Sequence, residues 1–101
     1  MKDLEELQVH EQNLQALLLQ KQILQTEMNE IDIALDELKN VDIAYKIVGG
    51  IMIKKDKNEL VKELNERKKI IELRIKNFEK QEEQIRKKIE EIREEILKSK
   101  K

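Results

Sequence analysis

The chain has 101 residues, of which 43% are charged and 2% are aromatic, and it contains no Cys, Pro or Trp. The absence of Cys excludes a disulfide framework, a thiol nucleophile and a Cys-based metal site. The length predicts a single domain over residues 1–101. Because the N-terminus has no signal-peptide pattern and no apolar run is long enough to span a bilayer, we expect a cytoplasmic protein that does not enter a membrane.

Residues 1–40 are predicted to form a long helix, because apolar residues recur at alternating spacings of three and four. This pattern is the a/d seam of a coiled coil. Eight of the ten seam positions are apolar, and the exceptions are His10 and Lys21. The ten positions are Leu7, His10, Leu14, Leu17, Lys21, Leu24, Met28, Ile31, Leu35 and Leu38.

Residues 41–55 break the helical period and are predicted to form a β-hairpin. Gly49-Gly50 suits a two-residue turn that needs positive φ at both positions, and both flanks are rich in β-branched residues. The alternative is one continuous helix with a kink at the two glycines.

The predicted hairpin is apolar on both faces near its turn, and an isolated two-stranded hairpin with open edges is marginal in water. The chain has no further segment to cover it, so we expect an obligate oligomer held together at the hairpins. The predicted oligomerisation residues are Ile43, Tyr45, Ile47, Val48, Gly49, Gly50, Ile51, Met52 and Ile53.

Residues 56–101 are predicted to form a second long helix, which starts at a capping box made by Asp56 and Glu59. Its seam again steps by three and four, and Lys68 and Glu82 are its polar exceptions. The eleven positions are Val61, Leu64, Lys68, Ile71, Ile75, Phe78, Glu82, Ile85, Ile89, Ile92 and Ile96.

A short hairpin returns the chain on itself, so the two helices are predicted to form an antiparallel coiled-coil hairpin, which makes the fold mainly α. This register places Lys21 one step from Glu82, and Lys68 within reach of Glu27 or Asp32. Residues 1–42 carry three Lys against ten acidic residues, whereas residues 54–101 carry 17 basic and 12 acidic residues. These charges form either two solvated helix faces or, as we expect, an attraction between the acidic first arm and the basic second arm.

Apolar residues also continue toward the free ends of both arms, where a two-helix pair cannot bury all of them. Exposed apolar patches usually mark binding sites. The predicted binding residues at the arm tips are Leu4, Leu7, Leu18, Leu19, Ile92, Ile96 and Leu97.

No residue pattern for catalysis, metal binding or cofactor binding is found. His10 is the only His, and at a seam position it is interpreted as a packing residue. Gly49-Gly50 lacks the spacing of a phosphate-binding loop. We therefore predict no catalytic residue, no metal site and no cofactor.

Four segments resemble the β-class subunits of archaeal prefoldin: Gln20-Lys21-Gln22, Ala34–Leu38, Ala44–Gly49 and Ile51–Lys54. The resemblance extends over the whole chain, because a single hairpin lies between two arms of similar length. One departure is the link Lys39-Asn40-Val41-Asp42, where β-class chains often have a Pro and extra residues.

The resemblance implies a hexamer of two α-class and four β-class subunits, whose hairpins join into an intersubunit β-barrel. It further implies that the coiled-coil tips hold unfolded client proteins without ATP and deliver them to a group II chaperonin.

Two other functions are left open by the residues alone. The chain could be a structural or tethering coiled coil without chaperone activity. The basic second arm could bind nucleic acid, but acidic residues are interleaved along it and no aromatic stacking platform accompanies it, so no nucleic-acid partner is expected.

Overall fold

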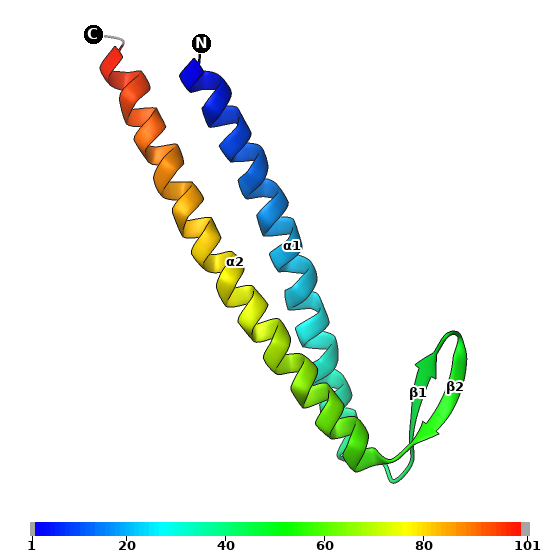
Figure 1. The fold of residues 1–101 in the computed structure, drawn as a ribbon. Coiled ribbons are helices and arrows are strands. Elements are labelled where there is room, and N and C mark those ends of the chain that lie inside the picture. The colour runs from blue at the N-terminus through cyan, green and yellow to red at the C-terminus, as the bar shows by residue number, and fades with distance from the viewer. Residues whose placement is uncertain (1, 100–101) are drawn as a thin grey trace. The chain divides into compact units, whose positions relative to one another are not determined.

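The computed structural model describes residues 2–99, and it consists of two long helices with a β-hairpin between them (Figure 1). Helix α1 spans Lys2–Leu38 and helix α2 spans Lys57–Ser99. Strands β1 and β2 span Ala44–Val48 and Ile51–Lys55. The predicted order of helix, hairpin and helix is confirmed, and the alternative of one kinked helix is wrong.

The turn of the hairpin is made by the two glycines. Gly49 has φ 56° and Gly50 has φ 79°, which is the left-handed conformation that a two-residue turn of this kind requires. The strands pair in an antiparallel register in which Val48 faces Ile51 next to the turn and Tyr45 faces Lys54. The Gly-Gly pair therefore determines both the position of the turn and the register of the strands.

The ends of the helices differ slightly from the sequence-based bounds. Helix α1 ends at Leu38, and the amides of Lys39 and Asn40 donate hydrogen bonds to the carbonyls of Asp36 and Glu37, both at 3.2 Å. At the start of α2, the amide of Glu59 donates to Oδ2 of Asp56 at 3.3 Å. Asp56 is therefore the N-cap, as its sequence spacing predicts, and satisfies an amide that would otherwise lack a partner.

The chain divides into two compact units, which are described separately. The tip unit contains the residues up to Leu24 and those from Arg74 onward, and the hairpin unit contains Gln25–Leu73. In both units the predicted seam forms the core, since every one of its positions is buried or half-buried.

The buried apolar side chains fall almost entirely on that seam. In the tip unit they are Leu17, Leu24, Ile89 and Ile92, and in the hairpin unit they are Ile31, Leu38, Ala44 and Ile71. Ile71 is the only one of them with no exposed surface. Ala44 is the exception to the seam, because it belongs to β1 and anchors the root of the hairpin.

Ion pairs between the helices confirm the predicted antiparallel register in each unit. In the tip unit, Nζ of Lys21 lies 3.3 Å from Oε1 of Glu82. In the hairpin unit, Lys68 contacts Asp32 at 2.8 Å. In the Lys21–Glu82 pair the carboxylate belongs to α2. In the other pairs that join the arms within residues 2–99, α1 supplies the carboxylate, which contacts Arg67, Lys68 or Arg93 of α2.

The Lys21–Glu82 pair is the one that sits in the seam itself. Each of the two side chains is only 20% exposed, and Glu82 also accepts a hydrogen bond from Arg86 at 3.0 Å. These bonds, first from Arg86 and then from Lys21, hold the pKa of the Glu82 carboxyl below its ordinary value of 4.5, although burial acts in the opposite direction. The pair satisfies two polar groups that would otherwise weaken an apolar seam, and it favours one register.

We predict that Lys21 and Glu82 stabilise the fold jointly. A double-mutant cycle with Lys21→Met and Glu82→Gln, measured by urea unfolding, should give a coupling of about 0.5–1 kcal/mol at neutral pH. Because the pKa of Glu82 is lowered in the folded state, this contribution is present above pH 4.5 and should be lost as the pH falls through the lowered value.

The control for this cycle is the pair Glu83–Lys87, which lies on the surface of α2 with both side chains 71% exposed. Its coupling should be close to zero because solvent screens it. Equal coupling in the two cycles would contradict the special role of the seam pair.

Candidate functional surfaces

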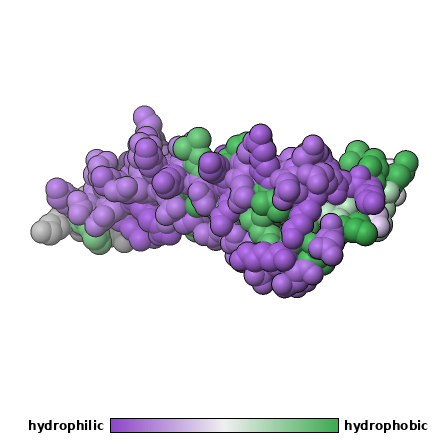
Figure 2. Space-filling view, turned by 90° about the horizontal axis from the view of Figure 1, so that it is seen from below, coloured by the Kyte–Doolittle hydropathy of each residue, from purple (hydrophilic) through white to green (hydrophobic). Residues whose placement is uncertain are grey.

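The hairpin presents apolar side chains to solvent on both of its faces. Figure 2 shows hydrophobic residues gathered on it. Ile47 is 69% exposed, and its cross-strand partner Met52 is 65% exposed. On the opposite face, Ile51 is 66% exposed and its partner Val48 is 50% exposed. All seven apolar residues among the predicted oligomerisation residues are thus about half exposed or more.

The sheet also has open edges. Within residues 2–99, it consists of β1 and β2 alone, so each strand has one side without a strand neighbour. An edge of this kind offers unpaired backbone N–H and C=O groups to another strand. The hairpin is therefore open to contact on both faces and along both edges.

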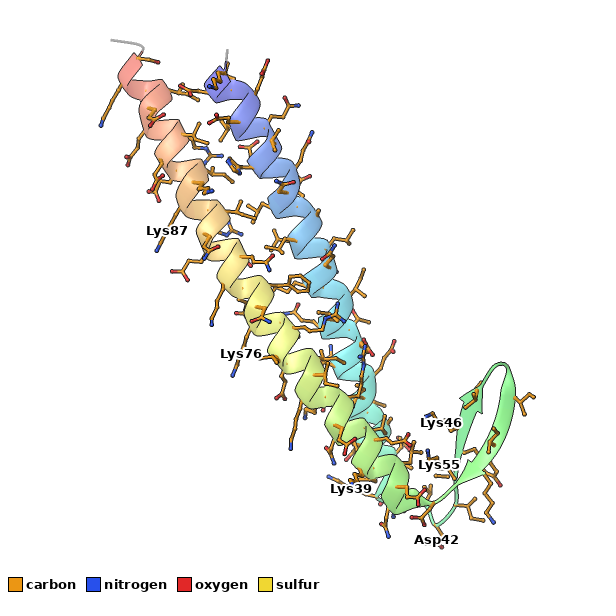
Figure 3. All side chains as sticks on the ribbon, viewed as in Figure 1. Lys39, Asp42, Lys46, Lys55, Lys76 and Lys87 are labelled. Carbon is orange, nitrogen blue, oxygen red and sulfur yellow. The ribbon has the colours of Figure 1, made fainter. Side chains whose placement is uncertain are left out.

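The root of the hairpin is tied to α2 by one carboxylate. Glu63 of α2 accepts a hydrogen bond through Oε2 from Nζ of Lys46 at 3.1 Å, and a second one through Oε1 from Lys55. Lys46 lies on β1 and Lys55 on β2, and both point from the strands toward α2 (Figure 3). The bonds from Lys55 and then from Lys46 lower the pKa of the Glu63 carboxyl. We call this three-residue contact the Glu63 clasp.

In the tip unit, a small apolar notch lies between the helix ends. It is lined by Leu4 and Leu7 of α1 and by Arg93, Ile96 and Leu97 of α2. The guanidinium of Arg93 is bound by Glu11 at 3.1 Å, which ties one wall of the notch to α1. Leu4 is 49% and Leu97 is 66% exposed, whereas Leu7 and Ile96 are half-buried.

The other three predicted tip residues do not line this notch. Ile92 is only 8% exposed, so the expectation that it lies on an open surface is wrong: as a seam residue it is packed against α1. Leu18 is half-buried and Leu19 is 60% exposed. Both lie on α1 more than ten residues after Leu7, which is about 16 Å or more along a helix. The notch therefore contains four of the seven predicted tip residues.

Sequence reasoning missed two features. No residue pattern predicts the Glu63 clasp. The contact of Lys46 and Lys55 with Glu63 depends on how the chain turns from β2 into α2. Four aliphatic residues outside the seam are also more than half exposed: Ile23, Ile33, Ile70 and Leu73. Their heptad positions could have revealed them, since each faces away from the seam.

Two further findings concern the described residues only. No cluster of three or more Asp, Glu or His side chains with a geometry suited to a metal ion is found among residues 2–99. None of the helices in this range combines the length and apolarity needed to cross a membrane.

Two paired helices that carry an uncovered apolar hairpin define a coiled-coil subunit built for assembly with other chains. The chain belongs to the prefoldin subunit family, whose model matches residues 1–101. Prefoldin subunits assemble into hetero-oligomers, and the family is one of non-enzymatic chaperones.

Among solved structures, the chain is similar to the crystal structure of the prefoldin beta subunit from Thermococcus strain KS-1. The TM-score is 0.89 and the sequence identity is 34%, over 97% of this chain and 89% of that chain. The resemblance to the β class of archaeal prefoldin is thereby confirmed. Among curated proteins no match is found.

We predict that the Glu63 clasp restrains the hairpin. The substitution Glu63→Gln should accelerate amide hydrogen exchange in both strands, because a neutral amide binds two ammonium groups more weakly than a carboxylate does. The pKa of Glu63 is lowered in the folded state, so the difference between the variant and the wild type should be present at neutral pH and vanish as the pH falls through that lowered value.

A suitable control is Glu66→Gln, because Glu66 is an exposed carboxylate of the same helix, three residues away. This substitution should leave exchange in the strands unchanged. If Glu63→Gln behaves in the same way as Glu66→Gln, the clasp does not restrain the hairpin.

Proposed function

We propose that the chain is a subunit of an ATP-independent holding chaperone, which captures unfolded polypeptides at its coiled-coil tips and delivers them to a group II chaperonin. The observation that carries this proposal is the presence of two separate apolar surfaces on one chain. One is the hairpin, with seven exposed apolar residues and open strand edges. The other is the notch that contains Leu4 and Leu97.

We assign the hairpin to assembly. Strand edges pair most readily with other strands, and side chains exposed on both faces of a sheet can be covered only by a closed or layered structure. These features support the joining of hairpins from several chains into an intersubunit β-barrel. The partners in this proposal are α-class subunits and other β-class copies, in a hexamer of two α-class and four β-class chains.

We assign the tip notch to client proteins. Burial of an aliphatic side chain contributes about 1.5–3 kcal/mol and has no directional requirement, so a notch of this kind fits apolar segments of many sequences. Several tips on one assembly convert weak single contacts into useful avidity. Neither step needs a nucleotide or a catalytic group, and the proposed location of this activity is the cytoplasm.

The assembly role is tested by Ile47→Asp combined with Ile51→Asp. The two residues lie on opposite faces of the hairpin, and burial of an unpaired carboxylate in a barrel is costly, so subunits should be released. Sedimentation velocity would measure the mass of the complex. Ile33→Asp serves as the control, because Ile33 is 63% exposed on α1 and should leave the mass unchanged. An unchanged mass for the hairpin variant would place the assembly contacts elsewhere.

The client role is tested by Leu4→Gln combined with Leu97→Gln, and by deletion of residues 1–9 together with 93–101. Both variants should assemble normally but protect a denatured, aggregating protein less well on dilution, as measured by light scattering. The matched control is Ile70→Gln with Leu73→Gln, two residues of α2 with exposures of 52% and 62%. If the full-length chain assembles but never protects a client, a tethering coiled coil becomes the better description.

A further inference from the structure

Between Gln8 and Ile23, the outer face of α1 carries no charged residue, although the exposed Lys2 and Glu5 precede this stretch on the same side of the helix. It consists of four Gln and four aliphatic residues, and every one of them is exposed. They are Gln8, Val9, Gln12, Gln15, Ala16, Leu19, Gln22 and Ile23. We call this surface the neutral face. In a chain with 43% charged residues, the side of a helix that faces solvent is where charge is expected to concentrate.

Helix α2 shows what such a side ordinarily looks like. Its outer positions in the tip unit are mostly charged, and Lys76 and Lys87 point from it into solvent (Figure 3). The charged outer residues are Lys76, Lys80, Glu83, Lys87, Glu90, Glu91, Glu94 and Lys98. Only α1 has an outer side that lacks charged residues over a stretch as long as Gln8 to Ile23, so a general need for a hydrated surface does not explain the neutral face.

The apolar residues of the neutral face follow a second stripe with helical spacing. Val9, Gln12, Ala16, Leu19 and Ile23 are separated by three and four residues in alternation, on the side of α1 opposite the first seam. Val9 is 52%, Leu19 is 60% and Ile23 is 59% exposed. Ala16 in the middle of the stripe leaves room for a close approach by another chain.

The residues beside the stripe are amides instead of charges. Gln8 and Gln15 flank it on one side, and Asn13 and Gln20 flank it on the other. Each of these side chains has both a hydrogen-bond donor and an acceptor. An unfolded polypeptide exposes apolar side chains together with unpaired backbone N–H and C=O groups, and such a surface offers partners to both without selecting for a sign of charge.

We propose that the neutral face is a second client-contact surface, which takes uncharged apolar segments of an unfolded polypeptide along the side of the arm. This inference rests on the proposed chaperone function and extends it beyond the tip notch. The notch binds one or two side chains between the helix ends. The neutral face lies along α1 and binds a longer segment through aliphatic contacts and amide hydrogen bonds.

The size of the face favours a client over a second copy of this chain. The 16 residues from Gln8 to Ile23 form a strip about 24 Å long and 10 Å wide, or roughly 240 Å², whereas stable interfaces bury about 800 Å² on each partner. Two neutral faces would therefore make a weak dimer. A weak contact is nevertheless useful to a holding chaperone, because it is repeated on several arms and releases its client readily.

The test compares three double variants of the full-length chain: Leu19→Gln/Ile23→Gln in the neutral face, Leu4→Gln/Leu97→Gln in the tip notch, and Ile70→Gln/Leu73→Gln as the control. Gln has high helix propensity and the substituted side chains are exposed, so the helices should be retained, as circular dichroism would verify. The probe is a fluorescently labelled, permanently unfolded polypeptide of low net charge, with its affinity measured by anisotropy.

The neutral-face variant should bind this probe about tenfold more weakly than the wild type, which corresponds to about 1.4 kcal/mol. The control should bind it as the wild type does. A second measurement places a photo-crosslinking residue at Gln12 or at Ala16, and the expected product joins the arm to the probe.

If the wild type binds the probe and the neutral-face variant binds it equally well, the inference is wrong while the proposed function stands. If the wild type does not bind unfolded polypeptide at all, the proposed function itself fails. If crosslinks at Ala16 join two arms instead of arm and probe, the occupant is a second copy and the inference is likewise overturned.

Discussion

The structure depends on one limit: two paired helices can bury one apolar stripe each and no more. The seam residues form this buried stripe, as the burial of Ile71 and Leu24 shows. The described residues contain no third layer that could cover further apolar surface. Any other apolar surface must stay in water or be covered by another molecule. Apart from the exposed Ile33, Ile70 and Leu73, the described residues have such a surface at the hairpin, at the tip notch and at the neutral face. These surfaces are therefore available for contact with other molecules.

Charge has a different task in this fold. The carboxylates of α1 and the basic groups of α2 meet across the seam in both units, for example Glu11 with Arg93 and Glu27 with Arg67. Exposed pairs of this kind add little free energy, but the wrong register would bring like charges together. Lys21 and Glu82 go further, because they occupy the seam and are largely buried there. Apolar contacts thus supply most of the stability, and charge selects the alignment.

The sequence predicted those parts of the fold that depend on neighbours along the chain. The seam follows from a spacing of three and four, the turn from two adjacent glycines, and the N-cap from Asp56 followed by Glu59. Lys21 and Glu82 could be paired because a hairpin at a known position sets the register. These inferences succeed because local geometry fixes each of them before any tertiary contact is considered.

Other features depend on the amount of surface that one helix covers on the other, which spacing alone does not give. Ile92 was expected to be exposed near a frayed end, but the pairing of the helices continues past it and buries it. The Glu63 clasp depends on the angle at which the hairpin leaves α2, and no residue pattern encodes that angle. Only the structure therefore shows which candidate binding residues lie in the notch, which lie on the neutral face and which are buried in the core.

The separation of surfaces also has a physical consequence for a subunit of this family. Assembly requires a contact that persists, and the hairpin offers backbone hydrogen bonds as well as apolar burial, which together make a strong and directional interface. In the proposed function, client holding requires a contact that can be given up, and the notch and the neutral face offer only small apolar areas, without a strand edge. A single large apolar surface could not meet both needs, because the affinity that holds subunits together would also retain the client. With the proposed placement of strong contacts at the hairpin and weak ones on the tip unit, the affinity for subunits and the affinity for clients would be set by different residues.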